Sequence, residues 1–125
     1  MDYDSLCAYL EAKPDSRRDM PFGADALVFK VMDKMFALVA WQADPLTINL
    51  KVDPVEAQIL RKQYPAVTPG YHMNKQHWIT VTLDGSIPDG EIQQWIDDSY
   101  RLVARGLSKA QKARLRMMGW TDDEA

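Results

Sequence analysis

The chain has 125 residues, of which 46% are hydrophobic and 26% charged, and its formal net charge is −3. These values suit a single soluble domain and disfavour an indiscriminate polyanion binder, and one cysteine excludes both a disulfide framework and a cysteine-based metal cluster. No apolar run approaches the ~18 residues that span a bilayer and no signal-sequence pattern is present, so we expect a cytoplasmic protein without membrane contact.

The first predicted element is a short helix. Asp2 or Asp4 can cap its start, apolar residues follow at helical spacing, and it ends at about Ala12. Residues 17–23 then form an irregular connector or a short edge strand, because Pro21 lacks the N–H that a central ladder requires.

Two strands are expected next, at residues 26–31 and 35–41. A tight turn at Asp33-Lys34 would join them, since Asp tolerates the left-handed conformation that such a turn needs. In that register Phe29 pairs with Leu38, and the large apolar residues share one face of the hairpin. Trp41 then projects from the opposite face.

A third strand and a second helix follow. The strand, residues 46–51, alternates cleanly between apolar and polar side chains, as in a sheet with one face on a core. Asp53 is a typical N-cap, Pro54 suits the first helical position and Glu56 completes a capping box. The helix ends before Pro65. The side chains expected to point inward from it are Val55, Ile59 and Leu60.

The second half predicts a fourth strand at residues 78–83, a long helix from near Pro88 to Gly106, and a basic helix at residues 109–118. The fold class is therefore α+β, a two-layer sandwich in which helices pack on one face of an antiparallel β-sheet. We expect one domain over residues 1–116 and a frayed tail over residues 117–125.

The segment between the second helix and the fourth strand, residues 64–78, contains both histidines. Pro69-Gly70 predicts a turn, and polar and aromatic residues crowd the positions after it, as in many binding loops. His72 and His77 are five residues apart with no third histidine, so we expect no metal site and no cofactor. A phosphate-cradling glycine loop and a hydrolase nucleophile elbow are both absent, and no catalytic residue is assigned.

Charge is unevenly distributed toward the C-terminus. Residues 84–98 include five acids and no bases, whereas residues 99–121 include six bases and no acids. The basic segment reads either as a solvated helix or as a phosphate-binding element. The non-core strand face, which carries Trp78, is either covered by a helix or exposed as a platform.

The chain contains a set of short motifs: Pro21-Phe22-Gly23, Lys34-Met35-Phe36, Lys51, Tyr64-Pro65, the run from Pro69 to Trp78, and Ser99-Tyr100. Taken together, they resemble the MmcQ/YjbR-like family of small bacterial proteins. The resemblance covers roughly residues 3 to 107. It implies a frataxin-like (CyaY-like) fold and a "double-wing" DNA-binding function, which rests on structural analogy. It supplies no catalytic residues.

We therefore expect a non-enzymatic DNA-binding protein in which cations neutralise phosphates and Trp78 stacks on an unpaired base. Two alternatives remain open: a small-molecule pocket at the loop of residues 72–78, and a protein-interaction module built from the basic C-terminal helix with Trp120. The sequence does not fix the oligomeric state, and we favour a monomer. The candidate nucleic-acid or ligand-binding residues are Lys30, Asn49, Lys51, Tyr71, His72, Asn74, Lys75, His77, Trp78 and Thr80.

Overall fold

The computed structural model describes residues 1–70 and 74–121. In chain order the elements of this part are α1 (Tyr3–Glu11), β1 (Arg17–Asp19), β2 (Leu27–Val31), β3 (Lys34–Ala40), β4 (Thr47–Lys51), α2 (Pro54–Gln63), β5 (Val67–Pro69), β6 (Trp78–Thr82), α3 (Asp89–Arg105) and α4 (Lys109–Met117). The strands form one sheet in the order β1-β2-β3-β4-β6-β5, and every neighbouring pair is antiparallel.

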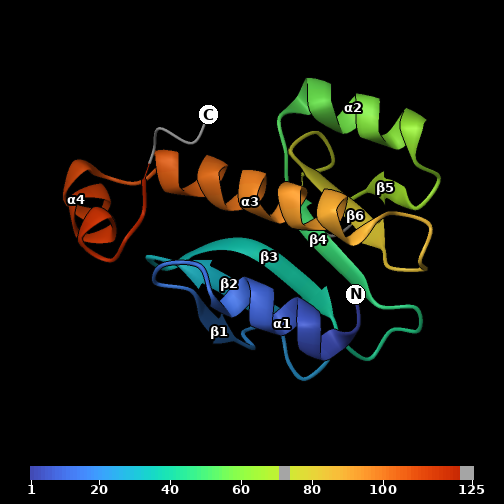
Figure 1. Cartoon of the computed structure of the whole chain (residues 1–125), viewed down its shortest axis with the longest axis horizontal. Helices are drawn as coiled ribbons and strands as arrows, with labels where there is room; N and C mark the ends of the chain where they lie inside the picture. Colours follow the sequence, from blue (N-terminus) through green and yellow to red (C-terminus); the bar gives the residue numbers. More distant parts are fainter. Residues whose placement is uncertain (71–73, 122–125) are drawn as a thin grey trace.

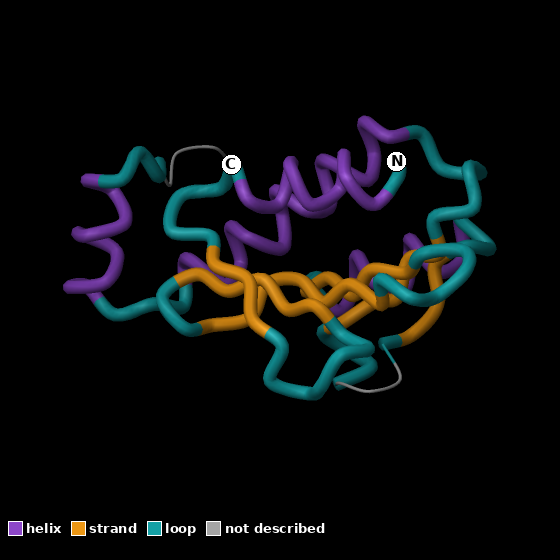
Figure 2. Tube along the Cα trace, turned by 90° about the horizontal axis from the view of Figure 1, so that it is seen from below, coloured by secondary structure: helices purple, strands orange, loops and turns teal. Residues whose placement is uncertain are grey.

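The helices and the sheet form two layers. Figure 1 shows α1 and α3 lying in front of the sheet, with α2 near β5 and β6 and α4 at one end. Viewed at 90° to this, the sheet separates α1 and α3 on one side from loop segments on the other (Figure 2). The expected α+β sandwich is confirmed. Within the described residues, no helix is both long and apolar enough to cross a membrane.

Alternation along β4 and β6 places the core as the sequence predicts. Ile48 and Leu50 on β4, and Ile79 and Val81 on β6, are all fully buried in one cluster. They meet the apolar stripe of α3, where Trp95 and other large side chains are buried. Period-two burial against a helix is the arrangement that stabilises a two-layer domain, at about 25 cal/mol per Å² of apolar surface removed from water.

The β2–β3 hairpin differs from its prediction. Its turn is at Met32-Asp33, where φ is 46° and 66°, and β3 begins one residue earlier than expected. Phe29 therefore lies opposite Ala37 rather than Leu38. The carboxylate of Asp15 accepts a 2.8 Å hydrogen bond from the Met32 N–H, which holds the turn in this position. That contact spans 17 residues, and the local pattern cannot reveal it.

Because of this register, the expectation that Trp41 projects from the non-core face is wrong. Trp41 packs against the core on the helix side, and its ring centroid lies 6.3 Å from that of Tyr3 on α1. Its indole N–H donates a 2.7 Å hydrogen bond to the Ala24 carbonyl.

Helix α2 starts as predicted but buries a different face. The Asp53 carboxylate accepts hydrogen bonds from the N–H groups of Val55 and Glu56, at 2.9 and 3.4 Å. Val55 and Ile59, expected to point inward, are 65% and 49% exposed. Leu60 is buried as expected, and Ala57 is buried in place of the other two. The helix packs beside β5 and β6, and the small side chain of Ala57 permits its close approach to the sheet.

Strand β5 lies within the segment that the sequence predicts to be a loop. Val67–Pro69 pairs with β6, and the Gly70 N–H continues the ladder with a 3.0 Å hydrogen bond to the Trp78 carbonyl. Pro69-Gly70 therefore extends a strand and does not form the expected turn. Proline is tolerated because β5 is an edge strand. The alternative of an edge strand after the first helix is confirmed by β1.

The described part of the C-terminal tail is folded, contrary to the expectation for residues 117–125. Helix α4 includes Met117, and Gly119 then adopts a φ of 105°. This lets the Trp120 N–H donate a 3.1 Å hydrogen bond to the Leu115 carbonyl, in a Schellman-type helix end. Trp120 is only 6% exposed and belongs to the core. Residues 122–125 lie outside the described part.

Candidate functional site

Trp78 and Lys51 lie opposite each other where β6 begins and β4 ends. Beside them is a cavity of about 350 Å³. Three parts of the fold enclose it: the start of β3, the adjacent ends of β4 and β6, and the last turns of α3. Its lining residues are Lys34, Met35, Lys51, Trp78, Leu102, Val103 and Gly106. We call this feature the Trp78 cavity.

Ser99 fixes the position of Lys51 in this cavity. The Ser99 side chain is fully buried, donates a 2.6 Å hydrogen bond to the Phe36 carbonyl and accepts a 2.8 Å hydrogen bond from the Lys51 N–H. One hydroxyl on α3 therefore holds two strands. It also satisfies the Phe36 carbonyl next to the register shift between β2 and β3, where ladder pairing is interrupted.

Tyr100 supports the same corner of the fold. Its ring packs edge-to-face on Phe36 with centroids 5.2 Å apart, and its hydroxyl donates a 2.6 Å hydrogen bond to the Pro14 carbonyl. Burial, and then the nearby Asp15 carboxylate, raise the pKa of the Tyr100 phenol, so it stays a neutral donor.

Gly70 is required by close approach to Trp78. A Cβ atom at Gly70 would lie 2.9 Å from the Trp78 Cβ and 3.1 Å from its carbonyl oxygen. Any larger residue would push β6 away from β5. The glycine therefore sets the position from which the indole projects.

Three of the predicted site residues already have partners within the sheet. Asn49 is 6% exposed, and its side-chain oxygen accepts a 2.7 Å hydrogen bond from the Thr80 hydroxyl. Lys30 forms a 3.0 Å ion pair with Asp19, and this hydrogen bond lowers the pKa of the Asp19 carboxyl. These contacts hold β1, β2, β4 and β6 together on the face away from the core. The polar groups of Asn49, Thr80 and Lys30 are therefore already paired, which the sequence does not show.

Three further predicted residues form an exposed turn before β6. The Asn74 side chain accepts a 2.9 Å hydrogen bond from the Gln76 N–H, and the His77 N–H donates to the Asn74 carbonyl at 3.1 Å. Asn74, Lys75 and His77 are all exposed. The His77 carbonyl accepts a 2.8 Å hydrogen bond from the Val52 N–H, which ties the turn to the end of β4. Tyr71 and His72 lie outside the described residues.

Sequence reasoning missed Lys34, Met35 and the end of α3. Lys34 and Met35 reach the cavity because β3 pairs antiparallel with β4, which brings the start of β3 next to the end of β4. Leu102, in the last turns of α3, is half-buried and lines the cavity edge. The family motif Lys34-Met35-Phe36 was the available signal for the first two.

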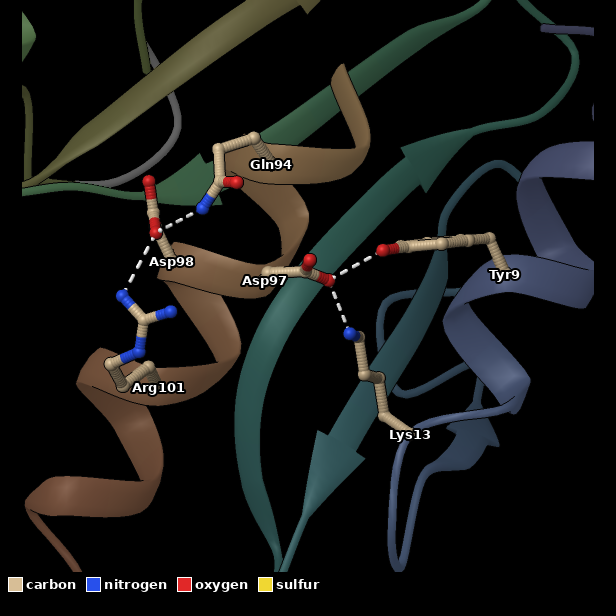
Figure 3. A network of polar contacts seen from close by, with 6 residues as sticks. All are labelled: Tyr9, Lys13, Gln94, Asp97, Asp98 and Arg101. Atoms are coloured by element: carbon tan, nitrogen blue, oxygen red, sulfur yellow. Dashed lines mark hydrogen bonds and ion pairs between the residues drawn. The ribbon is translucent and has the colours of Figure 1, made fainter. Parts of the chain in front are cut away.

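Polar contacts between α1 and α3 set how the helices lie over the sheet. Figure 3 shows Tyr9 of α1 and Lys13, in the turn after α1, pointing to Asp97, while Gln94 and Arg101 both point to Asp98. The Tyr9 hydroxyl donates a 2.7 Å hydrogen bond to Asp97. Burial, and then this carboxylate, raise the pKa of Tyr9 to about 12. The described residues contain no cluster of three His, Cys, Asp or Glu side chains that could hold a metal ion.

The fold and cavity define a small two-layer α+β domain with a lysine- and tryptophan-lined depression at one end of its sheet. The sequence model of the YjbR family matches residues 11–102, and the chain belongs to this family.

Relatives of known sequence and structure match most of the chain. It is 36% identical to the uncharacterised protein YjbR of Escherichia coli (strain K12), over 92% of this chain and 98% of that one. It is 41% identical to the uncharacterised protein YbdF of Escherichia coli O157:H7, over 77% of this chain and 79% of that one. The crystal structure of Deinococcus radiodurans protein DR2400 superposes with a TM-score of 0.87 at 40% identity, covering 97% and 90% of the two chains. A crystal structure of a Pseudomonas syringae protein gives a TM-score of 0.71 at 36% identity, covering 82% of this chain and 98% of that one.

Proposed function

We propose that this protein is a non-enzymatic nucleic-acid-binding protein that holds an unpaired base against Trp78. The observation that carries the proposal is the Trp78 cavity, where an indole and two lysines share one depression of about 350 Å³. An aromatic face beside cationic groups is the combination that binds single-stranded nucleic acid without reading its sequence.

The charges and shape of the cavity favour an unpaired strand over a duplex. The ammonium groups of Lys34 and Lys51 can neutralise phosphates, while stacking on Trp78 contributes about 1–3 kcal/mol per base. The neighbouring turn adds exposed Lys75 and His77. Asn49 and Thr80, bonded to each other, support the strands under this site and do not reach bases. The DNA-binding site that we propose is therefore at one end of the sheet.

A second candidate function is binding of a free nucleotide or another anionic aromatic molecule. The cavity volume falls within the range of about 300–1,000 Å³ that is typical of small-molecule sites. Such a ligand would raise the melting temperature at concentrations above its dissociation constant. It differs from the first proposal because added nucleotides on an oligonucleotide would not improve binding.

The test is fluorescence anisotropy of a labelled dT12 oligonucleotide titrated with protein over a salt series. Binding to a single strand should weaken with salt by about 0.7 log units per phosphate neutralised and per log unit of salt. We expect Trp78→Ala to weaken binding by about 5- to 150-fold, as follows from the stacking energy. Trp78→Phe keeps an aromatic face and should retain most of the affinity.

Lys51→Gln serves as a second variant. None of the ion pairs found within the described residues includes Lys51, so the substitution breaks no such pair. It should reduce the salt slope by about 0.7. Absence of dT12 binding by the wild-type protein at low salt would refute the proposal. So would equal affinity of the wild type and a folded Trp78→Ala variant.

A further inference from the structure

Helix α4 is a basic element that the Trp78 cavity leaves unexplained. We infer that α4 extends the site, so that a single strand leaving the cavity continues along its basic face through phosphate contacts. This inference rests on the proposed function and adds to it the path of the bound strand and the length of strand required.

The charge of α4 has one sign. The segment of residues 99–121 contains six basic residues and no acidic one. Lys109, Lys112 and Arg116 are spaced by three and four residues, so they lie on one face of α4. Such a face attracts a polyanion even though the whole chain has a net charge of −3. Salt screens charges that lie farther away than one Debye length, about 8–10 Å, so the nearby basic residues determine the local attraction.

Leu115 of α4 and Trp120 just after it attach the helix to the domain. Leu115 is fully buried and Trp120 is 6% exposed, while Lys109 and Arg116 are exposed. A capping box formed by Ser108 and Gln111 fixes the first turn. The Arg116 guanidinium lies 5.4 Å from the centre of the Trp120 ring. The helix is therefore fixed to the domain, with Lys109 and Arg116 exposed on it and Lys112 half-buried.

Helix α4 lies close to the Trp78 cavity. Gly106 lines the cavity, and Lys109 follows three residues later, so their Cα atoms are at most about 11 Å apart. The nine residues of α4 add about 13 Å of helix. Figure 1 shows α4 at the end of the molecule where β3 begins, and Lys34 is the first residue of β3. A strand of several nucleotides can therefore span both features, as in compact domains that cover about 4–16 nucleotides.

Strand length and charge removal together test this path. Anisotropy titrations would compare labelled dT4, which fills only the cavity, with dT12, which reaches α4, for the wild type and for Lys109→Gln/Lys112→Gln. The double variant should lower the salt slope on dT12 by about 1.4. The ratio of wild-type to variant affinity should therefore change about sevenfold between 50 and 200 mM salt. Its slope on dT4 should match that of the wild type.

Lys62→Gln is the matched control for Lys109→Gln, because both lysines are exposed on helices and Lys62 is on α2. Glutamine keeps the helix propensity of lysine, so neither change should unfold the chain. Lys62→Gln should leave both slopes unchanged.

The outcomes separate this inference from the proposed function. If Trp78→Ala weakens dT12 binding but the α4 double variant keeps the wild-type slope, the strand does not follow α4 and only the inference fails. Equal slope losses on dT4 and dT12 would also overturn the path, since the short strand does not extend along α4. If the wild type binds neither oligonucleotide at low salt, both ideas fail.

Discussion

Replacing Ser99 with alanine should lower the free energy of unfolding more than replacing an exposed serine does. The hydroxyl is fully buried and makes two short hydrogen bonds, to the Phe36 carbonyl at 2.6 Å and from the Lys51 N–H at 2.8 Å. Its removal orphans two backbone groups, each of which costs about 1–3 kcal/mol when no partner replaces it. Lys51 is half-buried beside the Trp78 cavity, so water can partly rehydrate its N–H. We expect a net loss of about 2–4 kcal/mol in the free energy of unfolding.

Urea unfolding followed by circular dichroism measures this loss directly. With a slope of about 1–3 kcal/mol per molar urea, the midpoint should fall by about 1 M or more. Ser86→Ala is the control, because Ser86 is exposed and its hydroxyl donates to the nearby Asp84 carboxylate. That variant should lose less than about 1 kcal/mol.

A loss for Ser99→Ala no larger than that of Ser86→Ala would refute this reasoning. It would mean that the bond between α3 and the two strands is not what fixes the ends of β3 and β4. Reduced affinity of a folded Ser99→Ala protein for dT12 would further connect this hydroxyl to the position of Lys51.

Two further perturbations probe the site and the contact between helices. Gly70→Ala should lower the free energy of unfolding by about 1–3 kcal/mol, because the new Cβ would lie 2.9 Å from the Cβ of Trp78. Gly90→Ala is the control: its Cβ would meet open space, so this change should be neutral or slightly stabilising. Equal effects of the two changes would contradict the close approach of Gly70 to Trp78. Raising the pH should destabilise the protein between about pH 10 and 12. The pKa of Tyr9 is about 12 in the folded state, above the value of about 10 in the unfolded chain. The stabilisation from the neutral phenol is therefore complete below pH 10 and is lost as the pH rises toward the folded-state pKa. Urea midpoints measured across this window should fall less for Tyr9→Phe than for the wild type, and an identical pH dependence would contradict the role of Tyr9.

Local patterns along the chain predicted most of the elements. The alternation of β4 and β6, the Asp53 cap of α2 and the apolar stripe of α3 depend on residues close together in sequence. Their physical causes, period-two or helical burial and side-chain capping, act over one element. The family motifs indicated the fold before any coordinates.

The candidate site was predicted only in part. Trp78 and Lys51 were chosen from their strand positions and do line the cavity. Lys34 joins them because β3 pairs antiparallel with β4, a pairing between strands that the local pattern does not reveal. Asn49 was correctly placed away from the core, but its pairing with Thr80 depends on β4 and β6 being neighbours. The roles of the ten predicted binding residues stay a prediction.

The sequence by itself determined which stretches form helices and strands and which face of β4 and β6 is apolar, because these follow from periodicity and capping within short segments. Tertiary structure alone decided the turn at Met32-Asp33, the burial of Trp120 and the enclosure of the Trp78 cavity. Each of these depends on contacts between residues distant in sequence, whose free energy appears only when the layers pack together.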